Sequence, residues 1–154
     1  MKTKKVIRLA EDFVDQEIAR ALYPKGLELI DHHRQAGHEI WLLSGAPAFL
    51  LRPLAVKLRA DFYIGMELES ANGIYRESIR GIHPRGKGKL TLIRRATMEA
   101  KSSLQQSFAY GDSIHDRYLL EAAENAVAVN PDRRLKALAL KRGWQIEDFR
   151  GKAV

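Results

Sequence analysis

The chain has 154 residues, no cysteine and a formal net charge of +7, and its hydrophobic and charged fractions are those of an ordinary globular protein. One domain with a sizeable core fits this length, while disulfides and thiolate metal sites are excluded. No apolar run is long enough to cross a membrane, and the N-terminus turns acidic before any long apolar block. We therefore expect no signal peptide and a cytoplasmic location.

The positive charge is dispersed over several segments, and no aromatic residues are interleaved with it in the manner that stacks nucleic-acid bases. We expect a solvated basic surface with a mild preference for anionic ligands, and neither a nucleic-acid nor a membrane partner. The run RRLKALALKR (133–142) leaves two explanations open. It could lie on an anionic membrane, or it could be the solvent face of a helix that packs on a sheet.

The first 47 residues predict two helices and a strand. Residues 8–22 have apolar spacings of four and five that favour a helix rather than a strand. The next helix begins near Pro24, which a first helical turn tolerates, and ends at Gly37. Residues 39–44 then form a strand, bounded by Gly45 and Pro47. The apolar face expected for the first helix consists of Leu9, Phe13, Ile18 and Leu22.

The remaining chain predicts alternating strands and helices. Residues 48–60 have helical spacing, although Pro53 requires a start or a kink there. The turn signal SANG (70–73) joins two strands into a hairpin. Because helical crossovers join parallel neighbours, the order that follows indicates an α/β fold with a parallel sheet. The later elements are expected as a helix over 89–101, a strand over 107–110, a helix from Asp116, a strand over 125–130, a helix over 131–143 and a strand over 144–149.

Polar residues follow the expected strands at three places. WLLSG ends with Ser44 and Gly45, RGKGKL places Lys89 at a helix start, and GDSIHD contains Asp112 and Asp116. In an open α/β sheet, ligands bind outside the carboxyl ends of the strands. A hydroxyl, an ammonium and carboxylate oxygens together suit Mg²⁺ and a phosphoryl group. Separately they could be a helix cap, a solvated lysine and a turn residue, but their order and context favour a site.

These segments also resemble a known family. WLLSG, GKGK and YGDSIHD look like motifs II, III and IV of the haloacid dehalogenase superfamily, in its phosphoserine-phosphatase-like branch, and residues 49–81 resemble the same branch. The likeness covers roughly residues 20–150, the size of one domain. It implies a Rossmann-like parallel sheet with flanking helices and a small β-hairpin. It also implies hydrolysis of a small phosphorylated metabolite with Mg²⁺ as cofactor.

The resemblance assigns roles to the candidate residues. Ser44 would bind the transferring phosphoryl group with Gly45, and Lys89 would neutralise that group and the nucleophile. Asp112 would ligate Mg²⁺, while Asp116 would orient that metal site or contribute to it. Lys87 fits the motif less well, because the pattern places the lysine after the second glycine.

The first motif of the family, a strand that ends in Asp-x-Asp, is absent from this sequence. Its first aspartate is the nucleophile, and a covalent route cannot run without it. Residues 1–22 instead resemble the last helix of the helical cap, which leaves 23–154 as the core domain and predicts a chain that starts late. The gap would expose sheet edges to a second copy or to a partner that donates a strand. We therefore expect little or no turnover by the chain alone.

Two other functions remain open. Residues 81–88, GIHPRGKG, nearly fit a P-loop, but Gly88 replaces the hydroxyl residue that would contact Mg²⁺. A non-catalytic fragment that keeps a phosphate- and Mg²⁺-binding surface is the other alternative. The histidines are expected at surface positions or helix ends rather than in a zinc site, because adjacent His32 and His33 would diverge on a helix.

Overall fold

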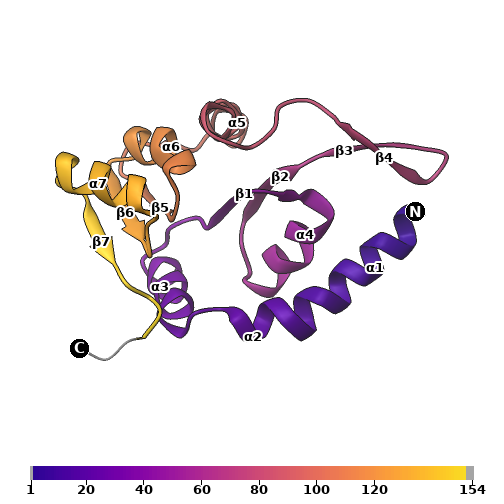
Figure 1. Ribbon diagram of the computed structural model, residues 1–154, viewed down its shortest axis with the longest axis horizontal. Coiled ribbons are helices and arrows are strands. Elements are labelled where there is room, and N and C mark those ends of the chain that lie inside the picture. Colours follow the sequence, from indigo (N-terminus) through magenta and orange to yellow (C-terminus); the bar gives the residue numbers. More distant parts are fainter. Residues whose placement is uncertain (1, 152–154) are drawn as a thin grey trace. The chain divides into compact units, whose positions relative to one another are not determined.

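The computed structural model describes residues 2–151, and the chain divides into two compact units, Met1–Pro84 and Arg85–Val154. Figure 1 shows the first unit in indigo to magenta and the second in rose to yellow. Each unit combines helices with a parallel sheet, and a β-hairpin completes the first. The expected α/β class is therefore confirmed. None of the helices formed by residues 2–151 is both long and apolar enough to span a bilayer.

The N-terminal segment is helical, as its spacing predicts. Helix α1 (Thr3–Phe13) continues through the π-helical turn η1 (Val14–Ile18) into α2 (Ala19–Ala21). The face expected from the sequence is wrong, since Leu9 and Phe13 are each 48% exposed. Packing against helix α4 (Ala48–Lys57) selects a different stripe at i, i+4 and i+8. That buried stripe consists of Val6, Ala10 and Val14.

The next elements of the first unit form a βαβ arrangement. Helix α3 (Pro24–Gln35) has Pro24 in its first turn and is followed by Gly37 with φ +78°, as predicted. Strand β1 (Trp41–Pro47) pairs in parallel with β2 (Phe62–Met66) after the crossover through α4. Helix α4 begins at Ala48 and runs through Pro53 rather than starting there. Pro53 removes one backbone donor from this helix.

The hairpin consists of β3 (Leu68–Ala71) and β4 (Ile74–Ile79), which pair antiparallel. Its two-residue turn has positive φ at both Asn72 (51°) and Gly73 (71°). This combination is typical of the type I′ turn, whose twist matches that of the flanking strands. The Asn-Gly pair in SANG therefore fixes the hairpin that the sequence predicts.

The second unit holds a three-stranded parallel sheet of β5 (Phe108–Gly111), β6 (Asn125–Val129) and β7 (Gln145–Glu147). Its helices are α5 (Lys87–Glu99), the 3₁₀ turn η2 (Ile114–Asp116), α6 (Arg117–Ala122) and α7 (Arg133–Arg142). Helix α6 is shorter than expected, because β6 already begins at Asn125. The core joins α6, α7 and the sheet through Ala109, Leu120, Ala128, Leu135 and Ala139.

Candidate functional site

The loop after β5 holds its two aspartates differently. Asp116 is only 5% exposed, whereas Asp112 is exposed. The backbone N–H groups of Asp112 and Ser113 donate to Asp116 Oδ2, with N···O distances of 3.3 and 3.4 Å. Ser113 and Asp116 also form a reciprocal capping box around the turn η2. Asp116 therefore fixes the loop that presents Asp112.

Gly111 allows this loop to close. A Cβ at this position would lie 2.7 Å from Asp116 Cβ, a separation that side chains do not tolerate. The strand can therefore end directly against the buried carboxylate only because residue 111 has no side chain. The glycine in YGDSIHD thus has a steric function as well as breaking the strand.

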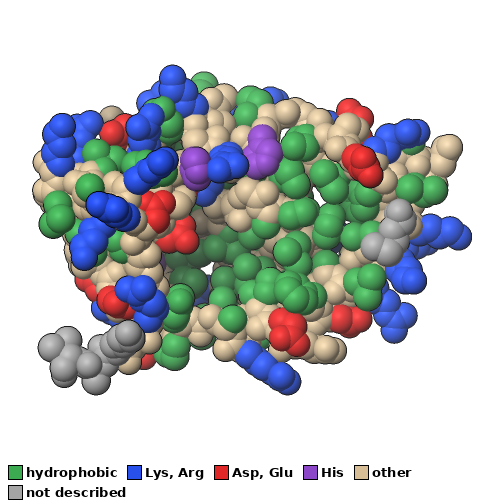
Figure 2. Space-filling view, viewed as in Figure 1, with side chains coloured by type: hydrophobic (Ala, Val, Ile, Leu, Met, Phe, Trp, Pro, Cys, Tyr) green, Lys and Arg blue, Asp and Glu red, His purple; other side chains and the backbone are tan. Residues whose placement is uncertain are grey.

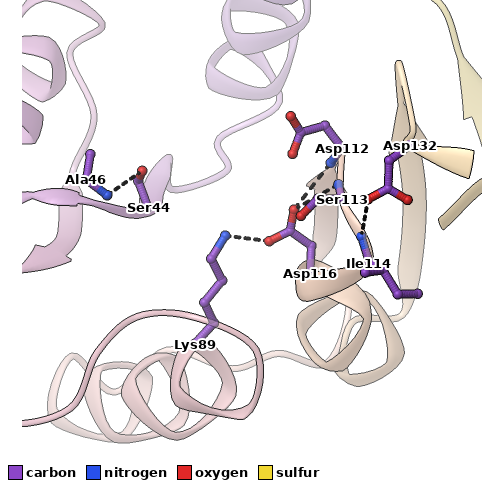
Figure 3. A network of polar contacts seen from close by, with 8 residues as sticks. All are labelled: Ser44, Ala46, Lys89, Asp112, Ser113, Ile114, Asp116 and Asp132. Carbon is purple, nitrogen blue, oxygen red and sulfur yellow. Dashed lines mark hydrogen bonds and ion pairs between the residues drawn. The ribbon is translucent and has the colours of Figure 1, made fainter. Parts of the chain in front are cut away.

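Lys89 Nζ in the first turn of α5 donates to Asp116 Oδ1 and forms a buried ion pair (Figure 3). The side chains of Lys89 and Asp116 are 14% and 7% exposed. A buried carboxylate is costly unless a cation and hydrogen bonds accompany it, and Asp116 has both. The structure thus brings together Lys89 and Asp116, which the sequence places 27 residues apart.

Asp112 presents the carboxylate that is available to a ligand. Among residues 2–151 nothing donates a hydrogen bond or an ion pair to its side chain, although its backbone carbonyl accepts from Asp132 N at 2.7 Å. In the described part of the chain, no three His, Asp or Glu side chains gather into a metal site. Mg²⁺ needs no such cage, because it binds through one or two carboxylates with water and substrate phosphate. The donor set therefore fits Mg²⁺ held chiefly by Asp112.

Asp132 is a further site residue that the sequence interpretation missed. Its Oδ1 accepts from Leu135 N at 2.7 Å as the N-cap of α7, and its Oδ2 accepts from Ile114 N at 2.9 Å. These two hydrogen bonds hold the pKa of Asp132 below its usual value, and the one from Leu135 has the larger effect. The side chain ties the start of α7 to the Asp112 loop (Figure 3). Its signal in the sequence was an aspartate between an apolar strand and an amphipathic run, the pattern of an N-cap.

Cations surround the same loop. Arg85 Nη2 lies 2.8 Å from His115 Nε2, so a second contact joins the start of α5 to the loop that contains Asp116. Lys87 Nζ lies 5.7 Å from the ring centroid of Tyr118. Arg117 also contacts Tyr118, through its ring and its hydroxyl group. The second unit therefore presents a positively charged rim, which suits an anionic ligand.

Ser44 and Gly45 belong to the first unit and lie in β1. Ser44 Oγ accepts a hydrogen bond from Ala46 N at 3.1 Å, which leaves the hydroxyl proton able to donate. A Cβ on Gly45 would meet only ordinary contacts, at 3.6 Å or more, with His83 and Pro84. Ser44 can thus present a hydroxyl donor, and its side chain does not cap the next helix, α4.

Comparisons with known proteins identify the relatives of this chain. A family model described as haloacid dehalogenase-like hydrolase matches residues 1–121. Phosphoserine phosphatase SerB1 of Mycobacterium tuberculosis is 34% identical over 145 residues, which are 94% of this chain and 47% of that protein. Histidinol-phosphatase of Neisseria meningitidis is 29% identical over 90% of this chain and 64% of its own length.

A solved structure also matches. A protein of unknown function from Bordetella pertussis Tohama I superposes with a TM-score of 0.90 at 25% identity, over 97% of this chain and 68% of that one. The chain spans about half the length of the mycobacterial relative that it matches. Because the family model covers most of the residues and the phosphatase exceeds 30% identity, the chain belongs to the haloacid dehalogenase-like hydrolases, in their phosphoserine-phosphatase-like branch.

Proposed function

We propose that the chain is a Mg²⁺-dependent phosphomonoester hydrolase domain that binds a small phosphorylated metabolite but has little or no turnover alone. One observation supports this most directly: the buried Lys89–Asp116 ion pair lies in the same loop system as the exposed Asp112. A fixed ammonium group and a neighbouring free carboxylate, which can hold a divalent cation, form an arrangement suited to a phosphoryl group. The named phosphatases among the relatives agree with this choice.

Each residue has a stated role in this proposal. Lys89 neutralises charge on the phosphoryl oxygens, and Asp116 positions Lys89 and the loop. Ser44, with the backbone around Gly45, donates to a phosphoryl oxygen. Bound Mg²⁺, held chiefly by Asp112, would supply further charge neutralisation on phosphate.

The low turnover follows from chemistry that the sequence does not contain. No Asp-x-Asp occurs among the 154 residues, and the two aspartates nearest the N-terminus, Asp12 and Asp15, lie on the helical segment from α1 to η1. Asp15 already pairs with Lys57 at 2.9 Å. A nucleophile for an aspartyl-phosphate route would therefore come from a separate strand donated by a partner of different sequence. In this assignment residues 1–22 are a cap helix and 23–154 the core.

A binding and turnover experiment tests the proposal. Purified chain is titrated calorimetrically with inorganic phosphate, with and without Mg²⁺, and is then assayed on an aryl phosphate. We expect Mg²⁺-dependent phosphate binding that Asp112→Asn weakens, without hydrolysis. Addition of a peptide that contains an Asp-x-Asp strand should raise turnover. Absence of phosphate binding under every condition would overturn the assignment.

The same assay separates the alternatives. Mg²⁺-dependent hydrolysis by the chain alone, abolished in Asp112→Asn, would show that it supplies a nucleophile, and Asp12 and Asp15 would then be mutated. Binding that the peptide never converts to turnover would favour a non-catalytic phosphate-binding protein. A P-loop is disfavoured because β4, the strand before Gly81, belongs to an antiparallel hairpin, whereas that motif follows a strand of a parallel sheet. Nucleotide binding lost in Lys87→Ala but retained in Lys89→Ala would revive it.

A further inference from the structure

Helix α7 has a basic outer face that the proposed function does not use. The helix contains five Lys and Arg residues and no acidic residue. Its inner side packs into the core of the second unit, where Leu135 and Ala139 are fully buried. Leu140, in contrast, is 67% exposed although it is a large apolar residue. The exposed side of α7 is thus both cationic and partly apolar.

The order of side chains around the helix is informative. At 100° per residue, six of the exposed positions occupy a continuous arc of about 160°. The apolar Leu140 and Ala137 lie toward the middle of this arc, while cations lie on both sides and between them. This set of residues, the α7 face, consists of Lys136, Leu140, Arg133, Ala137, Lys141 and Arg134.

Most cations of this face have no carboxylate partner among the described residues. Arg142, which lies outside this arc, pairs with Glu121 at 3.1 Å. Within residues 2–151, the four cations of the α7 face have no carboxylate within ion-pair distance. Arg134 lies close enough to Asp132 only to contribute to the lowered pKa of that cap, behind the backbone hydrogen bonds from Leu135 and Ile114. An external anion could therefore bind here without first breaking an ion pair.

The distribution of charge in the chain agrees with an anion-binding surface on the second unit. From Arg85 onward there are fourteen Lys and Arg against eight Asp and Glu, a net charge of +6. The first unit has twelve against eleven, a net charge of +1. Figure 2 shows Lys and Arg side chains gathered over the part of the view where α6 and α7 lie.

Stability of the helix explains Lys141, which lies in the last turn where the dipole favours a cation, but it does not explain the two arginines of the first turn. Arg133 and Arg134 occupy the first turn, where the positive end of the helix dipole disfavours a cation by about 0.3–1 kcal/mol each. Asp132 offsets part of this as the N-cap. A helix that only needed a solvated polar surface would gain from acidic residues at these positions.

We propose that the α7 face binds the surface of an anionic lipid bilayer. Its cations would lie at the headgroup phosphates, and Leu140 would enter the boundary between headgroups and acyl chains. A nucleic acid is the weaker fit, because the exposed Leu140 lies among the cations and the arc has no aromatic residue for base stacking. Since each basic residue near such a surface contributes about 1 kcal/mol, binding by four of them is reversible and sensitive to salt.

Vesicle sedimentation tests this proposal with the full chain. Vesicles of phosphatidylcholine alone are compared with vesicles that also contain phosphatidylglycerol, at low and at high NaCl. We expect binding only to the anionic vesicles, with loss at high salt. Lys136→Ala with Lys141→Ala should weaken it about thirtyfold, from about 1 kcal/mol per cation. The matched control is Lys4→Ala with Lys5→Ala, which removes the same charge from exposed positions of α1 and should change binding much less.

Leu140→Ser separates lipid from other polyanions, because it keeps the charge and removes the apolar centre. It should weaken binding to anionic vesicles while leaving the salt dependence unchanged. Equal binding to neutral vesicles, or no binding to either kind, would overturn the proposal. So would an equal loss in the α1 control, which would assign binding to total charge. Preferential binding of an RNA competitor that Leu140→Ser does not affect would identify a nucleic-acid surface instead.

Discussion

The two units of the molecule differ in where they place charge and apolar surface. The first is almost neutral, and ten of its large hydrophobic side chains are exposed, against three in the described part of the second. The second carries +6 and contains the buried Lys89–Asp116 pair. The charged groups suited to phosphate binding are thus concentrated in the second unit.

The two units also differ in how they stabilise a similar parallel βαβ arrangement. The first unit relies on helix packing, α1 against α4 through small and medium side chains. In the second unit, hydrogen bonds to Asp116 and Asp132 fix the loop after β5 in addition to an apolar core. Substitutions of polar groups should therefore affect the second unit most, and steric substitutions should affect the first.

The largest expected effect comes from Lys89→Ala. It leaves the Asp116 carboxylate buried without its cation. We therefore expect the free energy of unfolding to fall by about 3–5 kcal/mol. Urea unfolding combined with amide exchange should show the loss in the second unit. The control is Lys87→Ala, which removes an exposed ammonium near the Tyr118 ring and should cost less than about 1 kcal/mol. Equal losses in both variants would show that the ion pair contributes no special stability.

A steric substitution tests the first unit. In Gly65→Ala the new methyl group would lie 2.7 Å from Ala48 Cα, at the close contact between β2 and the start of α4. Because backbone must move, we expect a loss of about 1–3 kcal/mol. Amide exchange should localise it to β1, β2 and α4. Gly45→Ala, in the paired strand, meets only contacts of 3.6 Å or more and should be far milder. A loss spread equally over both units would contradict a local steric effect.

A smaller effect is expected at the cap of α7. Asp132→Ala removes the acceptor of both Leu135 N and Ile114 N and should cost about 1 kcal/mol, up to about 2. Asp132→Asn keeps most of the cap and serves as the control. Because the folded pKa of Asp132 is lowered, its contribution is present above its ordinary pKa and is lost as pH falls through the lowered one. Thermal unfolding against pH should therefore show a weaker acid dependence in the alanine variant.

The sequence predicted correctly those turns and helix ends that are set by the backbone preferences of one or two residues. Pro24 and Gly37 mark the limits of α3, and Asn72-Gly73 marks the hairpin, because each sets backbone angles by itself. The order of the elements also placed the Asp112 loop after β5 and Lys89 at the start of a helix, and the structure joins them through the Lys89–Asp116 ion pair. Details that depend on distant partners were missed or wrong.

The helix face of α1 illustrates this limit. Leu9 and Phe13 have the right spacing, but α4 packs on the stripe that contains Ala10 instead, and no local pattern encodes that partner. Likewise, the helix expected over 131–143 includes Asp132 without a role of its own, since its second hydrogen bond reaches Ile114, 18 residues away. Sequence spacing specifies a helix more reliably than it specifies what the helix packs against.

The last prediction uses a histidine pair that the sequence interpretation also missed. His33 Nδ1 and His38 Nδ1 lie 2.9 Å apart, so α3 and the segment before β1 are joined by a contact that requires one neutral ring as acceptor. Burial first, and then His38 and His32, lower the pKa of His33 from 6.5. As pH falls through 6.5, the unfolded chain takes up a proton more readily than the folded one, so the free energy of unfolding decreases.

His33→Gln should flatten this dependence of the free energy of unfolding on pH in the first unit. His32→Gln, at an exposed position of the same helix, should largely retain it. An unchanged slope in His33→Gln would assign the acid sensitivity to other groups.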